Sequence, residues 1–244
     1  SKATGAMASL QQLGVHRYGL GLWQALRAYR TFVRPILEYG LAIVPFTYDE
    51  HADLQRAHVS CVKLSMNCTT DRRLPTIVPQ VMADLPSMTL RARILQLKFV
   101  TRALDLPPTT MLRSVVLNWL QRHKTYQYWT RLTNGNPLYR SWKTLVTGPE
   151  NDCPKYPVAS TIKQHRDLEL SSRRDRFSTI RALRSSRMID PVLYLPAASR
   201  DRHRLIHWRM HWLPSYPLRP CRCRTTTEAS RKHYLDCTLI QDEL

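Results

Sequence analysis

The chain has 244 residues, 43% of them apolar, and its 37 basic side chains against 18 acidic ones give a formal net charge of +19. With 7 Gly, 16 Pro and 6 Cys, the composition excludes a collagen-like chain, a low-complexity chain and a small disulfide scaffold, and the length suffices for a proper core. No apolar run approaches the roughly 18 residues that a membrane-spanning helix needs, so no membrane partner is expected.

The type of cation narrows the choice of partner. Lysine occurs 8 times, so arginine supplies the other 29 of the 37 basic residues. A guanidinium offers a planar fork of donors that matches phosphate and stacks on bases, whereas an ammonium is a point charge. The excess of arginine therefore favours RNA or DNA as the partner. A basic structural protein of a ribonucleoprotein is the alternative that the charge leaves open.

Helical spacing of apolar side chains dominates residues 1–106, and the predicted fold class is mainly α. The expected helices cover residues 2–13, 20–39, 48–66 and 89–104. Pro35 stands near the centre of the second helix and should kink it or split it into two. Because Pro107 and Pro108 end this block, residues 1–106 are predicted to form one compact helical domain.

A connecting region is expected at 107–190 and a C-terminal segment at 191–244. Residues 111–133 have helical spacing with aromatic and basic side chains interleaved, which suits stacking on unpaired bases and equally suits an ordinary packed helix. Residues 134–157 contain Asn-Gly-Asn-Pro and Thr-Gly-Pro, which predict a linker. Residues 161–188 predict a helix surrounded by arginines, which needs an acidic partner to cover it.

The most specific chemical signal lies near the C-terminus. Cys221 and Cys223 are followed after nine residues by His233 and after three more by Cys237. Three thiolates and an imidazole make a tetrahedral ligand set suited to zinc, and binding would order a segment that has few apolar residues of its own. Three reduced cysteines in a disordered tail are the alternative. Basic side chains surround the set: Arg219, Arg222, Arg224, Arg231 and Lys232.

No catalytic constellation is recognisable in the sequence. There is no paired aspartate, no Gly-rich phosphate loop, no His-Glu-x-x-His and no Gly-x-Ser-x-Gly. Phosphoryl transfer by two metal ions needs clustered carboxylates, and the 18 acidic residues are dispersed. The chain alone is therefore expected to be inactive as an enzyme.

Three passages carry a resemblance to a known family. The first is residues 2–14 followed by Tyr-Arg-Thr-Phe-Val-Arg-Pro-Ile-Leu-Glu-Tyr-Gly at 29–40. The second is Pro-Ser-Met leading into Arg-Ala-Arg at 86–93, and the third is His-Trp-Arg-Met-His-Trp-Leu-Pro at 207–214, which runs into the Cys/His set. Together they resemble the region C-terminal to the palm of non-LTR (LINE-type, jockey-like) retrotransposon reverse transcriptases. That family's CCHC knuckle usually has four residues before its last cysteine, where this chain has three.

The resemblance implies a division of labour within a larger RNA-directed DNA polymerase. Residues 1–106 would be its thumb, which grips template and primer, and the C-terminal segment would be a zinc knuckle that binds nucleic acid. The palm carboxylates that hold Mg²⁺ would lie upstream of Ser1 in the same polyprotein, so we expect this sequence to be part of a longer reading frame. The implied partners are RNA, DNA, an RNA/DNA hybrid and that upstream palm.

Two groups of basic side chains are the expected nucleic-acid contacts. The thumb contacts would be Arg27, Arg30, Arg34, Arg91, Arg93 and Lys98, and the knuckle contacts would be Arg222, Arg224 and Arg231. Contacts to phosphate fix register without reading bases. The expected setting is a nuclear or cytoplasmic ribonucleoprotein rather than the secretory route. A free-standing zinc-dependent DNA- or RNA-binding protein, such as a domesticated remnant of an element, is the alternative.

Overall fold

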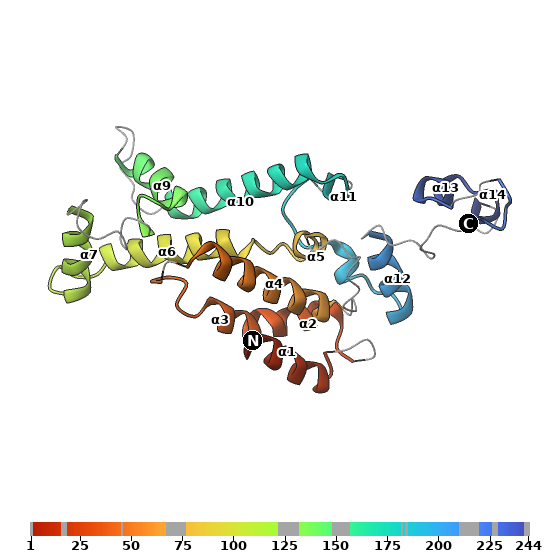
Figure 1. Ribbon diagram of the computed structural model, residues 1–244, viewed down its shortest axis with the longest axis horizontal. Coiled ribbons are helices and arrows are strands. Elements are labelled where there is room, and N and C mark those ends of the chain that lie inside the picture. Colours follow the sequence, from red (N-terminus) through yellow and green to blue (C-terminus); the bar gives the residue numbers. More distant parts are fainter. Residues whose placement is uncertain are drawn as a thin grey trace.

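The computed structural model describes most of the chain, and every regular element in the described residues is helical, which confirms the mainly α fold class. The described residues are 2–15, 19–44, 46–66, 77–121, 132–147, 157–181, 183, 185–209, 220–225 and 229–241. Figure 1 shows a long helix, α6, in the middle of the molecule, with α4 on one side and α10 on the other. Within the described residues, no helix is both long and apolar enough to cross a membrane.

The helix expected at 20–39 is not split at Pro35, since residues 22–38 are helical throughout, but its winding changes just before the proline. It begins as α2 (Leu22–Ala28), widens into a π-helical turn (Tyr29–Val33) and continues as α3 (Arg34–Glu38). Proline has no N–H to donate to the carbonyl four residues back, so the helix before it takes a wider turn. In that turn the N–H of Arg34 bonds the carbonyl of Tyr29, five residues back.

Two neighbouring helices complete the N-terminal layer. α1 (Lys2–Gln12) packs against α4 (Tyr48–Ser65). α4 begins with a reciprocal cap, in which the Glu50 N–H donates to the Thr47 hydroxyl over 3.3 Å and the Thr47 N–H donates to the Glu50 carboxylate over 2.7 Å. This capping box satisfies two backbone donors that a helix start otherwise leaves unpaired.

The long helix α6 (Met88–Leu104) belongs to two hydrophobic clusters. It follows the short helix α5 (Val78–Met82), and its first turn is capped by Ser87, whose hydroxyl accepts from the Leu90 N–H. Its N-terminal end packs with α4 and its C-terminal part packs with α7 (Met111–Gln121). The buried side chains of the second cluster are Leu90, Ile94, Leu97, Val100, Ala103, Val116, Leu138 and Tyr139.

The linker predicted at 134–157 is wrong for much of its length, because residues Pro137–Thr147 form the helix α9. Asn136 supplies the start, since its side-chain Oδ1 accepts from the Leu138 N–H over 3.0 Å, and proline is well tolerated in the first helical turn. Leu138 and Tyr139 then enter the second cluster, with Trp142 packed against it. The Asn-Pro pair therefore marks a helix start. Residues 148–156 lie outside the described part of the chain.

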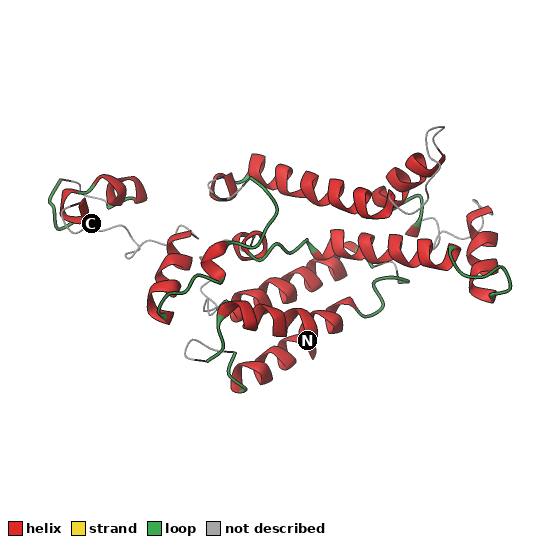
Figure 2. Ribbon diagram, turned by 180° about the vertical axis from the view of Figure 1, so that it is seen from behind, coloured by secondary structure: helices red, strands yellow, loops and turns green. Residues whose placement is uncertain are grey.

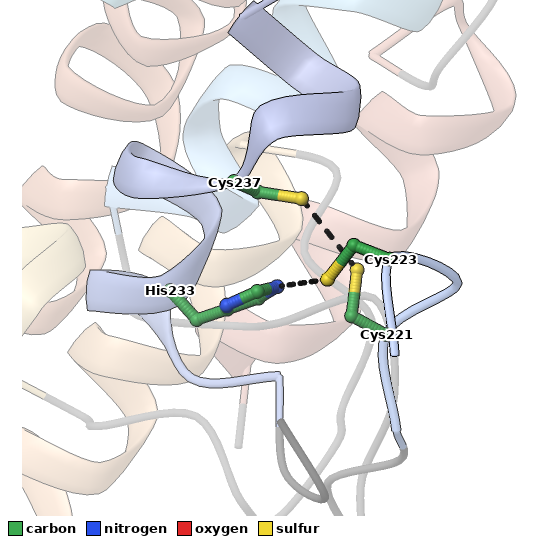
Figure 3. A group of neighbouring side chains, drawn as sticks. All are labelled: Cys221, Cys223, His233 and Cys237. Carbon is green, nitrogen blue, oxygen red and sulfur yellow. Dashed lines mark hydrogen bonds between the residues drawn. The ribbon is translucent and has the colours of Figure 1, made fainter. Parts of the chain in front are cut away.

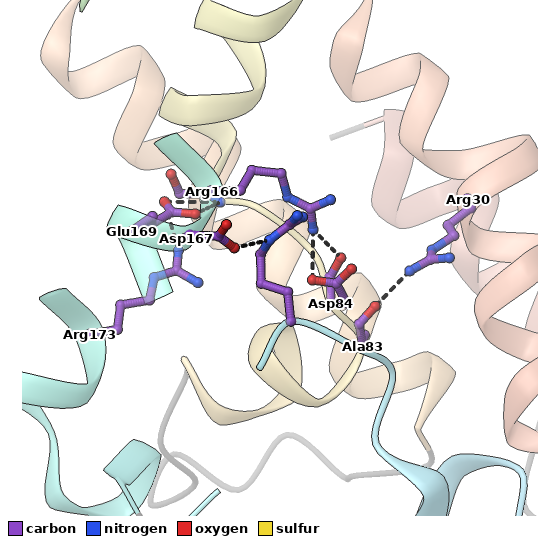
Figure 4. Close-up of polar contacts among 9 residues, drawn as sticks. Arg30, Ala83, Asp84, Arg166, Asp167, Glu169 and Arg173 are labelled. Atoms are coloured by element: carbon purple, nitrogen blue, oxygen red, sulfur yellow. Dashed lines mark hydrogen bonds and ion pairs between the residues drawn. The ribbon is translucent and has the colours of Figure 1, made fainter. Parts of the chain in front are cut away.

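The Arg-rich helix expected at 161–188 begins earlier and ends earlier, as α10 (Pro157–Arg176), followed by α11 (Ser178–Arg181). It lies along α6 and α9. Two arginines of α10, and Arg187 beyond it, pair with acidic side chains of this chain, as Figure 4 shows for the two in the helix. The ion pairs are Arg166 with Asp84, Arg173 with Glu169 and Arg187 with Asp167.

The first hydrophobic cluster crosses both predicted domain boundaries. Besides side chains between Ala3 and Ala92, it contains Ile180, Leu183, Val192, Leu193 and Ile206. Ile180 belongs to α11 and Leu183 follows that helix, whereas the other three come from the 3₁₀ turn Pro191–Leu193 and from α12 (Ser199–Arg209). The short helices α13 (Arg231–Asp236) and α14 (Thr238–Gln241) lie beyond α12, apart from the helical body, as both ribbon views show (Figures 1 and 2).

Candidate metal centre

The four residues predicted as metal ligands lie together in the structure. One ligand atom from each of Cys221, Cys223, His233 and Cys237 lies within 4.8 Å of the others. Figure 3 shows the four side chains pointing toward one another. A turn presents the first two cysteines, closed by a bond of 3.0 Å from the Arg224 N–H to the Cys221 carbonyl. This group of four could hold a metal ion.

Helix α13 presents the other two ligands. Ser230 caps it by accepting from the His233 N–H over 3.3 Å, and Cys237 is the residue at its C-terminal end. Positions four apart lie on one face of a helix, so a spacing of three intervening residues brings the imidazole and the thiol to the same side. The spacing of three residues between His233 and Cys237 is thus accommodated by one helical turn.

The distances fit tetrahedral coordination. The sulfurs of Cys221 and Cys237 are 3.7 Å apart, and the sulfur of Cys223 is 3.3 Å from Nε2 of His233. Around a tetrahedral zinc with its usual bond lengths, two sulfurs lie about 3.8 Å apart and a sulfur and a nitrogen about 3.5 Å apart. These two separations therefore nearly match those that a shared ion imposes, and the other pairs of ligand atoms lie within 4.8 Å.

Protonation of the cysteines differs across the group. The Thr225 hydroxyl lies 2.9 Å from the Cys223 sulfur, and hydrogen bonding from Thr225 lowers the pKa of Cys223 to about 6. Burial raises the pKa of Cys237. Since only the thiolate is a good metal ligand, hydrogen bonding from Thr225 favours the form of Cys223 that binds metal.

The surroundings of the centre are basic on the turn and aromatic on the helix. Arg222 and Arg224 are exposed, and Arg224 has a φ of +62°, which is uncommon for a residue with a side chain. The ring of Tyr234 packs edge-on against Trp208 of α12, with centroids 6.1 Å apart. This contact links the centre to the helical body. The Arg231 side chain lies outside the described residues.

The predicted thumb contacts have different environments. Arg27 is exposed on α2, whereas Arg30 donates from Nη2 to the Ala83 carbonyl over 2.6 Å, a contact visible in Figure 4. Arg34 and Arg91 both pair with Glu38. Arg30 and Arg91 therefore join separate elements, whereas Arg34 pairs within its own helix, and contact of all three with nucleic acid stays a prediction.

The other two predicted thumb contacts, Arg93 and Lys98, are half-buried on α6. Arg93 lines a cleft together with side chains that the sequence patterns did not single out, among them Tyr48, His51 and Gln96. The sequence signal that could have indicated this cleft is the pair of aromatic residues, Phe46 and Tyr48, at the start of α4.

Comparisons with known proteins add no identification. The chain matches no protein-family model, no curated protein and no solved structure.

Proposed function

We propose that this chain is a nucleic-acid-binding protein whose C-terminal segment is built around a zinc ion. The observation that carries the proposal is the convergence of four soft ligands, with two exposed arginines on the turn that presents two of them. Thiolates and imidazole select zinc over the hard cations Mg²⁺ and Ca²⁺, which prefer oxygen ligands. A net charge of +19 makes a polyanion the fitting partner.

The zinc centre would fix the position of the positive charges. Cys223 stands between Arg222 and Arg224, so ligation of its sulfur holds both backbone positions against α13. Ordering the turn in advance lowers the entropic cost of contacting phosphate. The bound ion would also neutralise part of the thiolate charge that otherwise repels nucleic acid.

The finer form of the proposal is that the chain is the thumb and knuckle region of a non-LTR reverse transcriptase. The passages at 29–40, 86–93 and 207–214 support it, together with a mainly α fold and a Cys/His cluster at the expected end of the chain. In this role the chain binds template and primer without catalysing polymerisation, because the Mg²⁺-binding palm lies in another part of the parent protein.

A binding panel tests the proposal. Zinc-loaded protein is titrated against four labelled nucleic acids of equal length: an RNA/DNA hybrid with a recessed primer end, duplex DNA, single-stranded RNA and single-stranded DNA. Tightest binding to the primed hybrid is the result expected of a thumb and knuckle. Tightest binding to one duplex DNA sequence would instead indicate a free-standing regulator, and absence of binding at low salt would overturn nucleic-acid binding altogether.

A further inference from the structure

A cleft of about 640 Å³ opens on the helical body, far along the chain from the Cys/His cluster. The beginning of α4, the first turns of α6 and the loop before α9 form its walls. The volume lies in the range of small-ligand sites in proteins. None of the described residues that line it is acidic.

Aromatic rings lie at one wall of the cleft. Phe46 and His51 pack against each other with ring centroids 5.9 Å apart, tilted by 49°. The side chain of Tyr48 is 88% exposed although it lines the same cleft. A large ring without protein packing on its face is a platform on which an unpaired base can stack.

Hydrogen-bond donors line the cleft from α6, at Arg93 and Gln96, and from α4, at Gln55. No hydrogen bond or ion pair of the half-buried Arg93 side chain is found among the described residues, although the residue lines the cleft. The Oε1 of Gln96 accepts from Asn136 over 3.3 Å, and the Oε1 of Gln55 accepts from the Met88 N–H over 2.9 Å. Both amides are therefore oriented with their NH₂ groups as the remaining donors.

His51 adds an unpaired polar atom to the cleft. Its Nδ1 is buried, with no hydrogen-bond partner in the described part of the chain. Burial first, and the charge of Arg93 second, lower the pKa of His51, so its ring is neutral near pH 7. A buried polar atom without a partner has a free-energy cost that a ligand can remove. The cleft thus offers neutral hydrogen-bonding groups beside one guanidinium.

We propose that this cleft binds one unstacked nucleobase, together with its phosphate, from a single-stranded segment of nucleic acid. Tyr48 stacks on the base, the side-chain amides and His51 contact its edge, and Arg93 pairs with the phosphate. The inference rests on the proposed function and deepens it, because it gives the helical body a preference for unpaired nucleotides. Both RNA and DNA supply such a nucleotide, and the test distinguishes them.

Matched substitutions test the proposal by fluorescence anisotropy with labelled 12-residue single strands of RNA and of DNA. Tyr48→Ala and Arg93→Gln are compared with Tyr39→Ala and Arg102→Gln. Tyr39 is 89% exposed and lies outside the cleft, and Arg102 is an exposed residue of the same helix as Arg93. Each cleft variant should weaken single-strand binding about fivefold or more, as expected for loss of one stacked base or one phosphate contact. Tyr48→Trp should keep the affinity.

An abasic strand separates base stacking from simple phosphate binding. It should bind the wild-type protein as weakly as the normal strand binds Tyr48→Ala. If the cleft and control variants lose affinity equally, or if the abasic strand binds as tightly as the normal one, the inference is wrong. In that case, retained binding of the wild-type protein to the primed hybrid would leave the proposed function intact. If the wild-type protein binds no nucleic acid, both proposals fail.

Discussion

Arg91 of α6 donates two hydrogen bonds to the carboxylate of Glu38 at the end of α3, from Nε to Oε1 over 2.7 Å and from Nη2 to Oε2 over 2.9 Å. Nε of Arg34, one helical turn before Glu38, lies 2.7 Å from the same Oε1. Bidentate pairs of this kind are the strongest and most directional ion pairs in proteins. One carboxylate thereby joins two arginines from segments far apart in the chain.

Glu38→Gln should lower the free energy of unfolding by about 1–3 kcal/mol, because two partly buried guanidinium groups lose their counter-charge. Urea denaturation followed by circular dichroism measures this change. Asp53→Asn is the matched control, since Asp53 forms an ion pair with Arg56 at an exposed position. Exposed pairs contribute at most about 1 kcal/mol. Equal effects of the two substitutions would show that Glu38 has no special structural role.

Acid should destabilise the helical body through His58. This buried imidazole is hydrogen-bonded at Nδ1 to the Tyr29 hydroxyl, and burial lowers its pKa from 6.5 to about 3. The unfolded chain takes up a proton near pH 6.5 that the folded chain takes up only near pH 3. The unfolded state therefore binds more protons between these values, and stability is lost as the pH falls through 6.5.

The contribution of His58 can be isolated by comparing slopes. Between pH 6 and pH 4 the free energy of unfolding of the wild-type protein should fall by about 1.4 kcal/mol per pH unit more than that of His58→Gln. Urea titrations at three pH values give both slopes. If the free energy of unfolding depends on pH equally in the wild-type protein and in His58→Gln, His58 titrates normally in the folded state.

Removal of the metal should affect the C-terminal segment without unfolding the rest. Neither hydrophobic cluster contains a described residue beyond Ile206, so the cores do not depend on the centre. Chelation should leave the midpoint of thermal unfolding unchanged and should speed tryptic cleavage after Arg222 and Arg224. Limited proteolysis with mass spectrometry measures the cleavage. A large drop of the unfolding midpoint on chelation would show that the centre supports the whole fold.

Arg224→Gly should separate metal binding from nucleic-acid binding. Glycine adopts the φ of +62° at this position without strain, so competition with a zinc indicator should show equal or tighter binding. Loss of one phosphate contact should make the plot of log K for nucleic-acid binding against log salt concentration less steep, by roughly 0.7–0.9 in slope. Arg222→Gly is the control, because it removes the same charge without relieving a positive φ. Unchanged salt dependence in both variants would remove the turn from the interface.

Local features were the ones that the sequence predicted well. The helix changes its winding just before Pro35, and the four predicted metal ligands from Cys221 to Cys237 lie together, because both features depend on nearby residues. The helix α9 was missed, since Asn136 and Pro137 were interpreted as a linker signal although the same pair begins a helix.

Long-range pairings could not be predicted from local patterns. The arginines of α10 predicted an acidic partner that covers the helix, but nothing nearby indicated that Asp84 would pair with Arg166 across 82 positions. The cleft could not be predicted from local patterns either, because its walls come from three segments that only the packing of α4, α6 and α9 brings together. Such sites depend on tertiary contacts, which the spacing of apolar residues and the amino-acid composition do not reveal.

The most direct test of the central claim is a titration of a labelled RNA/DNA hybrid with zinc-loaded protein and with the same protein after chelation. The account predicts that zinc-loaded protein binds and that removal of zinc weakens binding at least about threefold, because Arg222 and Arg224 are no longer held in place. Added zinc should restore the affinity of the wild-type chain and not that of Cys223→Ser. Binding that is equally tight with and without zinc, or absent in both, would contradict a zinc-centred nucleic-acid-binding protein.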